Sequence, residues 1–193
     1  KGDRFVFEDG TDARFWGTNF NSGACFPSHE HSEKVARRLA RFGVNIVRFH
    51  QMDAEWSTPN LFQFSKGAFP GNTRSLDPRS MDRLDYLIAR LKDNGIYVYL
   101  DMLTYRKFRS GDGVAFAELM PDSAKPYSCF DPHLIELQKE FNEQLWTHVN
   151  PYTELAYKDD PAIVLTEVTN ECDLFHQPVT IPHYREMLET RFS

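Results

Sequence analysis

The amino-acid sequence predicts an α/β protein of the (β/α)8 TIM-barrel type, and three observations support this. Short apolar runs alternate with segments whose apolar residues recur every three to four positions, which favours a parallel sheet covered by helices. Connections from a helix to the next strand are tight, whereas the connections from a strand to the next helix are long, with roughly 30 residues after Phe49 and after Asp101. In a TIM barrel such strand-to-helix loops build the site. No Gly-rich phosphate loop follows the first strand, which disfavours a dinucleotide-binding sheet.

Four strand–helix units follow a short β-hairpin in residues 1–14, whose predicted turn is Asp9-Gly10. Helix starts are indicated by residues that cap helix N-termini, and helix ends by glycine. The predicted strands span 15–20, 44–49, 96–101 and 163–169. The predicted helices begin after the caps Ser32, Asp77 and Asp131 and, for the fourth, at Thr180-Ile-Pro182, while Gly43 and Gly95 end the first two.

Four units are only half of a barrel, since a complete one needs eight units and ~250 residues. We therefore expect residues 1–193 to be the N-terminal half of one (β/α)8 catalytic domain, with the missing C-terminal half of the barrel as its partner. An open half barrel leaves two sheet edges unpaired. We expect this half alone to be inactive and prone to association.

The composition excludes some partners. The net charge is −6 without a dense basic cluster, so we expect no nucleic-acid partner. No apolar run approaches the ~20 residues of a membrane span. Cys25, Cys129 and Cys172 are odd in number and lack CxxC spacing, which argues against a disulfide framework or a zinc knuckle. The first residues are neither an initiator Met nor a signal peptide; the compartment stays open, with secretion or a periplasmic location as options.

The segment DDPAIVLTEVTNE, residues 159–171, contains an apolar strand that ends in Asn170-Glu171. A carboxylate next to a buried strand is costly unless it is hydrogen-bonded or paired, so its presence there requires a reason. The motifs around the other strands supply part of that reason.

Four motifs occur in order along the chain: RFWGTN at 14–19, GVNIVRFH at 43–50, DNGIYVYLD at 93–101 and DDPAIVLTEVTNE at 159–171. Together they resemble the first four strands of clan A glycoside hydrolases, and most closely those of glycoside hydrolase family 5, which contains cellulases and mannanases. The resemblance covers nearly the whole chain, and the Asn-Glu pair is its most specific element.

The resemblance implies retaining hydrolysis of the O-glycosidic bonds of a β-linked oligo- or polysaccharide, without metal or cofactor. Two carboxyl groups ~5–5.5 Å apart carry out that reaction. Glu171 matches the family's acid/base, Asn170 the residue that hydrogen-bonds the sugar 2-hydroxyl, and Arg48 the arginine beneath the nucleophile. The family's nucleophile is a glutamate at the end of strand seven, which would lie outside this chain.

Four more residues are candidate substrate contacts: His50, Trp56, Asp101 and Tyr105. Each also has a structural alternative, namely a hydrogen-bonded histidine, a carboxylate behind the site, or loop packing for the aromatic rings. Glu167 is expected to pair with Arg48. The family often has a histidine shortly after the position of Asp101, and Met102 to Tyr105 stand there instead, which leaves the sugar contacts open. Cys172 stands where a proline is common.

Two other functions are compatible with these residues. A metal-dependent hydrolase on the same fold could use His29 and His31, spaced as HxH in a loop before the Ser32 cap, with His50, Asp101 and His176. A non-catalytic half barrel could bind carbohydrate without cleaving it.

Overall fold

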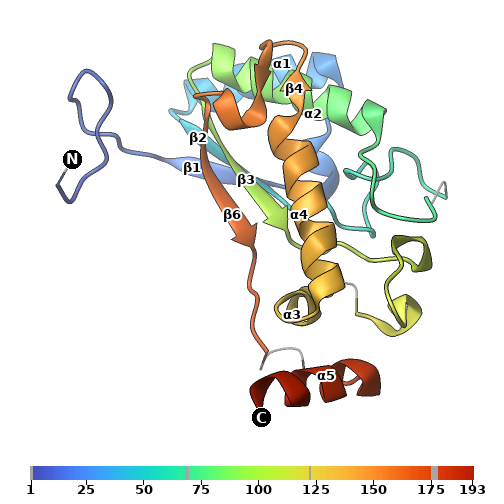
Figure 1. Ribbon diagram of the computed structural model, residues 1–193. Helices are drawn as coiled ribbons and strands as arrows, with labels where there is room; N and C mark the ends of the chain where they lie inside the picture. Colours follow the sequence, from blue (N-terminus) through green and yellow to red (C-terminus); the bar gives the residue numbers. More distant parts are fainter. Residues whose placement is uncertain (1, 68–69, 122, 175–177) are drawn as a thin grey trace.

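The computed structural model describes residues 2–67, 70–121, 123–174 and 178–193. Its centre is a four-stranded parallel sheet in the order β1-β2-β3-β6 (Figure 1). The strands of this sheet are β1 (Gly17–Asn21), β2 (Ile46–His50), β3 (Tyr97–Leu103) and β6 (Ile163–Thr169). The helices are α1 (His29–Arg41), α2 (Pro78–Asp93), α3 (Lys125–Ser128), α4 (Pro132–Thr147) and α5 (Pro182–Phe192). All neighbours within this four-stranded sheet are parallel, as the alternation of the sequence predicts.

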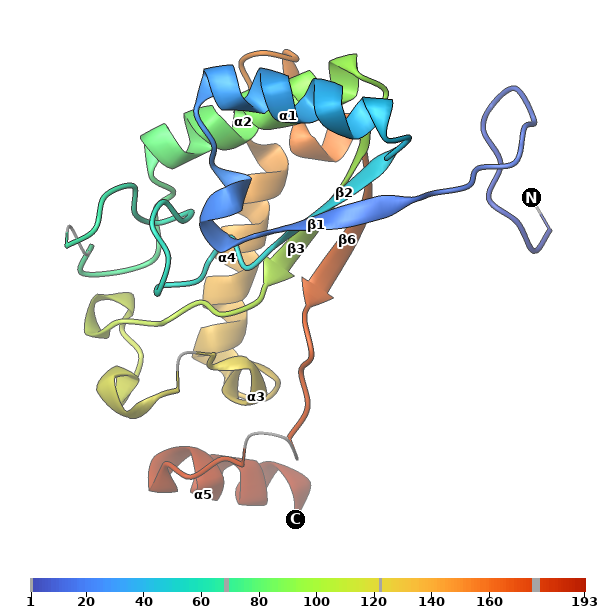
Figure 2. The same cartoon turned by 180° about the vertical axis from the view of Figure 1, so that it is seen from behind.

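The helices α1, α2 and α4 cover one face of the sheet, and α4 lies behind the strands in Figure 2. Alternation along β2 and β3 places Val47, Phe49, Val98 and Leu100 in the core under these helices, where they are fully buried. The residues between them, including Arg48 and Tyr99, lie on the opposite face. That face therefore carries polar and charged side chains.

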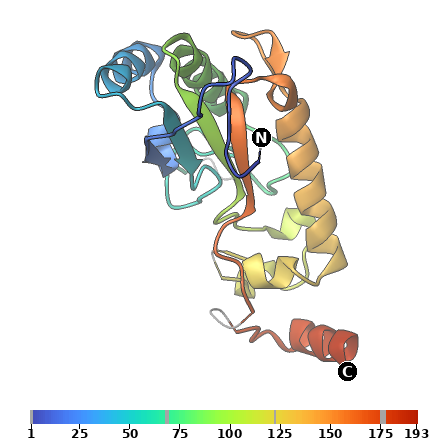
Figure 3. The ribbon, with the colours of Figure 1, turned by 90° about the vertical axis from the view of Figure 1, so that its left-hand side faces the viewer.

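The strands β3 and β6 point towards α5, which lies beyond their carboxyl ends (Figure 3). A second apolar cluster joins α5 to α4 and to the loop after β3, with Phe108, Tyr127, Leu134 and Tyr184 among its buried members. The long loops after β2 and β3 thus lie on the carboxyl side, as the sequence predicts. Within the described residues, no helix is both long and apolar enough to cross a bilayer.

The start of α1 differs from the prediction of a cap at Ser32. Ser28 is the N-cap, because its backbone is extended and its hydroxyl accepts a hydrogen bond from the His31 amide at 3.3 Å. Ser32 lies inside the helix, fully buried, and its hydroxyl donates to the Ser28 carbonyl at 3.1 Å. Ser28 directly follows Pro27, and nothing between it and Ser32 breaks a helix. His29 and His31 are consequently helical residues.

Prolines that follow an aspartate cap predict the starts of α2 and α4 more accurately. Pro78 and Pro132 follow the caps Asp77 and Asp131, whose carboxylates accept hydrogen bonds from backbone amides of the first turn. Proline suits the first helical position because the amide it lacks has no partner there. Strand β1 instead begins two residues later than predicted, since the Trp16 amide donates to the Asn45 side chain at 2.7 Å.

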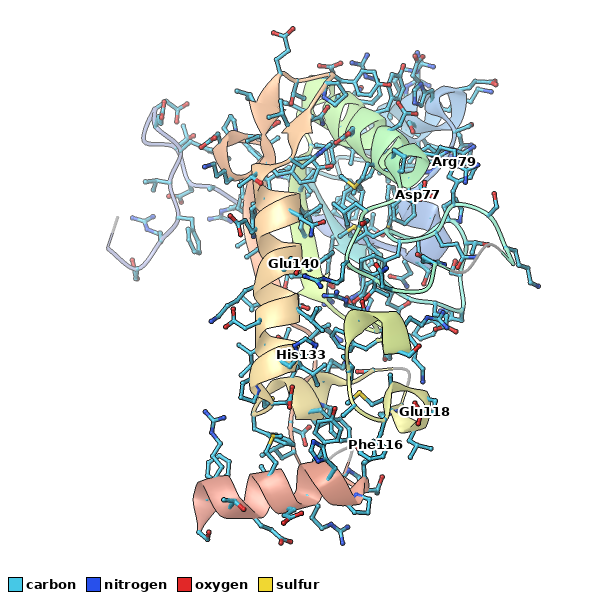
Figure 4. The ribbon with its side chains drawn as sticks, turned by 45° about the vertical axis from the view of Figure 1, so that its right-hand side comes forward. Asp77, Arg79, Phe116, Glu118, His133 and Glu140 are labelled. Atoms are coloured by element: carbon cyan, nitrogen blue, oxygen red, sulfur yellow. The ribbon has the colours of Figure 1, made fainter. Side chains whose placement is uncertain are left out.

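Replacing Asp77 by alanine is expected to lower the free energy of unfolding by about 1 kcal/mol. Its carboxylate accepts from the amides of Arg79 at 2.9 Å and Ser80 at 3.1 Å, at the start of α2 (Figure 4). Urea unfolding measures the change. The control is Asp77→Asn, which keeps an oxygen acceptor and should lose less; equal losses would contradict the capping explanation.

Two small substructures complete the fold. In the first residues, Val6 bridges Asp12 around a turn at Gly10, and Phe7 and Phe15 pack against Tyr97 at the amino end of β3. The strands β4 (Val149–Asn150) and β5 (Leu155–Ala156) pair antiparallel. This pair and α3 have no signal in the sequence, because elements of two to four residues are too short to show a period.

Candidate active site

Arg48, on β2, is the centre of a polar cluster at the carboxyl end of the sheet. Its guanidinium binds both oxygens of Asp101, with Nε 3.0 Å from Oδ1 and Nη2 2.9 Å from Oδ2. The first contact is a charge-assisted hydrogen bond and the second is an ion pair. The strand register explains the contact, because β2 and β3 are adjacent and Arg48 lies opposite Tyr99, two residues before Asp101.

The same guanidinium reaches β6. Nη2 donates to a carboxylate oxygen of Glu167 at 2.5 Å and to the Asn170 side-chain oxygen at 2.9 Å. Burial disfavours the charged guanidinium, but the hydrogen bond and charge of Asp101, with the charge of Glu167, outweigh it and raise the pKa of Arg48. Arg48 therefore stays charged and ties β6 to β2 and β3.

Asp101 and Tyr99 link the cluster to its surroundings. The Asp101 side chain is 0% exposed, and its Oδ2 also forms a hydrogen bond with Nδ1 of His50. The Tyr99 hydroxyl donates to Glu167 at 3.1 Å. Burial, followed by the hydrogen bond with Glu167, raises the pKa of Tyr99, so its hydroxyl stays a proton donor. Both carboxylates are thus held by more than one donor.

Asn170 and Glu171 follow β6 directly and have contrasting surroundings. Asn170 is buried. Its backbone N–H donates to the Leu103 carbonyl at 2.9 Å, and its side-chain oxygen accepts a hydrogen bond from Arg48. Its Nδ2 has no hydrogen-bond partner among the described residues. Glu171 is exposed and has φ +47°, the left-handed conformation, which ends the alternation of the strand. No described residue hydrogen-bonds or pairs with the Glu171 carboxylate.

The aromatic candidates form a separate pair in the loops. The rings of Trp56 and Tyr105 meet edge to face with centroids 4.6 Å apart, and Trp56 is 54% exposed. Asp53 fixes this loop by accepting from the amides of Thr104 and Tyr105 at 2.8–3.1 Å. The buried Lys125 places its ammonium 4.7 Å from the Tyr105 ring centroid, a cation–π contact.

Sequence reasoning omits Tyr99, Asp53 and Lys125 from this site. Tyr99 has a usable signal, since it shares the face of Arg48 and Asp101 by strand alternation. Asp53 and Lys125 come from loops, where no period fixes the direction of a side chain. Of the predicted residues, the structure joins Arg48, His50, Asp101 and Asn170 directly; Glu171 adjoins them in the chain, and Trp56 and Tyr105 contact each other.

One histidine of the pair considered for a metal site, His29, is engaged elsewhere. His29 hydrogen-bonds Asp82 through Nε2 at 2.9 Å and stacks on Tyr86 with ring centroids 3.9 Å apart, both on α2. His50 and Asp101 belong to the Arg48 cluster, and His176 lies outside the described residues. In the part of the chain that the structure describes, no three histidine, cysteine, aspartate or glutamate side chains are grouped to hold a metal ion.

Comparison with known proteins gives matches in structure only, since no protein-family model and no curated protein matches the sequence. An endo-1,4-β-D-mannanase from Thermotoga petrophila RKU-1, solved with maltose and glycerol, has a TM-score of 0.59 and 23% identity, over 82% of this chain and 45% of its own. The endo-1,4-β-mannanase from Rhizomucor miehei has a TM-score of 0.65 and 18% identity, over 89% of this chain and 47% of its own. A glycoside hydrolase family 5 mannosidase from Rhizomucor miehei has a TM-score of 0.56 and 15% identity, over 81% of this chain and 44% of its own.

The chain spans about half the length of these solved structures. The likeness covers most of this chain and includes the parallel sheet with its helices, which confirms the fold class predicted from the sequence. At these identities it is a likeness of fold. The chain thus has the (β/α)8 type of fold seen in these two mannanases and this mannosidase, over about half of their length.

Proposed function

We propose that this chain supplies the acid/base half of a retaining glycoside hydrolase that cleaves β-linked glycans. Glu171 is the acid/base, and the nucleophile is a glutamate on a strand of the barrel beyond the four described here. The observation that carries the proposal is the Arg48 cluster, which fixes Asn170 at the carboxyl end of β6 and so places Glu171 at the same edge. Charged groups at that edge of a TIM barrel are typically catalytic.

Asn170 and Glu171 have suitable groups to offer. Arg48 occupies the side-chain oxygen of Asn170, so Nδ2, which has no partner among the described residues, is left to donate to a sugar hydroxyl. A buried donor without a partner is costly, and a hydroxyl would satisfy it. The Glu171 carboxylate is not held by a described side chain, so it can exchange a proton with a substrate.

The reaction would proceed in two steps. Glu171 donates its proton to the glycosidic oxygen while the second glutamate attacks the anomeric carbon, so the leaving alcohol departs and a glycosyl ester forms. The ionised Glu171 then takes a proton from water, whose oxygen attacks the anomeric carbon and releases the ester carboxylate. Arg48 lies at the base of the site, where its positive charge would keep the nucleophile ionised.

The neighbouring structures make β-mannan the first substrate to test, with β-linked glucan beside it. Residues 1–193 joined to the C-terminal half of the barrel should hydrolyse one of them and release a product of retained anomeric configuration, seen by NMR at early times, whereas residues 1–193 alone should not. Activity should survive a chelator, which separates this proposal from a metal-dependent hydrolase. Inversion, or loss of activity on chelation, would contradict it; binding without cleavage would support the non-catalytic carbohydrate-binding alternative.

Replacing Trp56 by alanine is expected to weaken glycan binding about 2- to 10-fold. We propose that its exposed ring is a platform for the apolar face of a sugar, and an aromatic contact of this kind contributes roughly 0.5–1.5 kcal/mol. Isothermal titration with a manno-oligosaccharide measures the affinity. Trp16 is the matched control, being 61% exposed but at the amino end of β1. Equal effects of Trp56→Ala and Trp16→Ala would exclude Trp56 as the platform.

A further inference from the structure

Two of the three cysteines lie against each other beside the candidate acid/base. Cys172 directly follows Glu171, and Cys129 follows α3, 43 positions earlier in the chain. Their sulfur atoms are 3.0 Å apart, and both thiols donate to the Lys125 carbonyl, at 3.5 Å from Cys129 and 3.3 Å from Cys172. The odd number and the spacing of the cysteines argue against a disulfide framework, but spacing carries no information on this tertiary contact.

We propose that Cys129 and Cys172 form a disulfide site, which reversibly links the segment carrying Glu171 to α3. A disulfide has a sulfur–sulfur distance of about 2.05 Å, so the two sulfurs need to approach by only about 1 Å. Cys25 cannot take part, because it is fully buried and its thiol donates to the Phe20 and His50 carbonyls. The site is therefore specific to one pair.

Exposure decides the order of the chemical steps. Cys129 is exposed, whereas Cys172 is only partly exposed. The oxidant is a low-molecular-weight disulfide such as oxidised glutathione. The Cys129 thiolate attacks one of its sulfurs and releases one glutathione thiolate, which takes up the proton that Cys129 lost. The Cys172 thiolate then attacks the Cys129 sulfur of the mixed disulfide and releases the second glutathione. Two cysteine thiols are oxidised and one small disulfide is reduced.

The second step should depend on pH. Burial, followed by the hydrogen bond with Cys129, raises the pKa of Cys172 to about 12. Burial of Cys172 also acts in the mixed disulfide, and since the thiolate is the attacking species, the rate of ring closure should rise with pH. A mixed disulfide on Cys129 would then accumulate at neutral pH and disappear faster at pH 9.

The link would constrain the chain that carries Glu171. Glu171 lies between the buried Asn170, which Arg48 and the Leu103 carbonyl hold, and Cys172, which the disulfide would hold. A cross-link of this loop length restricts the unfolded chain, and we expect the thermal midpoint of the oxidised protein to exceed that of the reduced protein by roughly 5–10 °C.

The test is a thiol count on the full chain after incubation with oxidised glutathione at pH 9, alkylation in denaturant, and peptide mapping by mass spectrometry. We expect one free thiol per chain, on Cys25, and a cross-linked peptide pair containing Cys129 and Cys172. Cys129→Ser and Cys172→Ser should abolish the cross-link, and the matched control Cys25→Ala should retain it. Three free thiols, or stable glutathione adducts on both cysteines, would overturn the proposal.

A second readout separates this site from the proposed function. Any effect of the disulfide on catalysis rests on the proposed glycosidase function, but the thiol count does not. If the cross-link forms and the complete barrel hydrolyses no β-glycan in its oxidised or its reduced form, the glycosidase proposal fails and the disulfide site stands. If hydrolysis occurs while Cys129 and Cys172 never form a disulfide, the disulfide proposal fails and the glycosidase proposal stands.

Discussion

In the complete barrel, replacing Glu171 by alanine is expected to slow hydrolysis of natural glycans by about 10²–10⁴-fold, the usual contribution of general acid–base catalysis. The loss should be large because an alkoxide leaving group needs the proton of Glu171. Activated aryl glycosides leave unaided, so the first step should change little and a glycosyl–enzyme intermediate should accumulate. Added azide needs no general base and should restore turnover, giving a glycosyl azide of retained configuration. Kinetics on both substrate classes, with product analysis, measures these effects.

The matched control for this change is Glu154→Ala. Glu154 is also an exposed glutamate in the left-handed conformation, with φ +59° against +47° for Glu171, but it lies in the turn between β4 and β5. Its replacement should leave the activity unchanged, because it removes the same side chain from the same kind of backbone outside the site. If Glu171→Ala slows both substrate classes alike and azide has no effect, Glu171 is not the acid/base.

Replacing Arg48 by methionine is expected to lower the free energy of unfolding by about 3 kcal/mol. Removal of one partner of a buried pair costs ~3–5 kcal/mol because it leaves an uncompensated charge. The lower end applies because 24% of the Arg48 side chain is exposed, whereas Asp101 is fully buried. Activity should fall with stability, since Asn170 loses the donor that orients it. Urea unfolding and assays at a temperature where the variant is folded separate the two losses.

A double-mutant cycle with Asp101→Asn tests the origin of that loss. Arg48→Met/Asp101→Asn removes both charges and should recover part of the stability lost in Arg48→Met alone. Arg37→Met is the control on an exposed face of α1, where the change should stay within about 0.5 kcal/mol. A loss below 1 kcal/mol for Arg48→Met, or strict additivity in the cycle, would show that the cluster is not a coupled unit.

The sequence predicts most of this arrangement where periodicity and capping apply. Asp77-Pro78 and Asp131-Pro132 mark helix starts because both the cap and the proline act locally. Strand alternation places Arg48 and Asp101 on one face, and parallel order brings them together. The start of α1 is missed because Ser28 and Ser32 are equally good caps in composition, and only the fold shows which one is buried. Here burial, a tertiary property, decides.

The rest of the site depends on features that no period encodes. The register between β3 and β6 shifts at Val98 and Tyr99, so counting along the strands alone does not give the exact pairs across them. The contact of Lys125 with Tyr105 and the approach of Cys129 to Cys172 depend on the course of long loops. Such contacts join segments far apart in sequence and follow only from the folded chain.

The left-handed backbone at Glu171 has a consequence for engineering this protein. Glutamate rarely adopts a positive φ, whereas glycine and asparagine do so readily, and strain of this kind costs of order 1–3 kcal/mol. A library selected for thermostability alone would therefore enrich asparagine or glycine at position 171. Each selected variant would have a higher melting temperature but would lack the carboxylate. A screen that combines heat challenge with turnover is therefore needed to keep stability and activity in one variant.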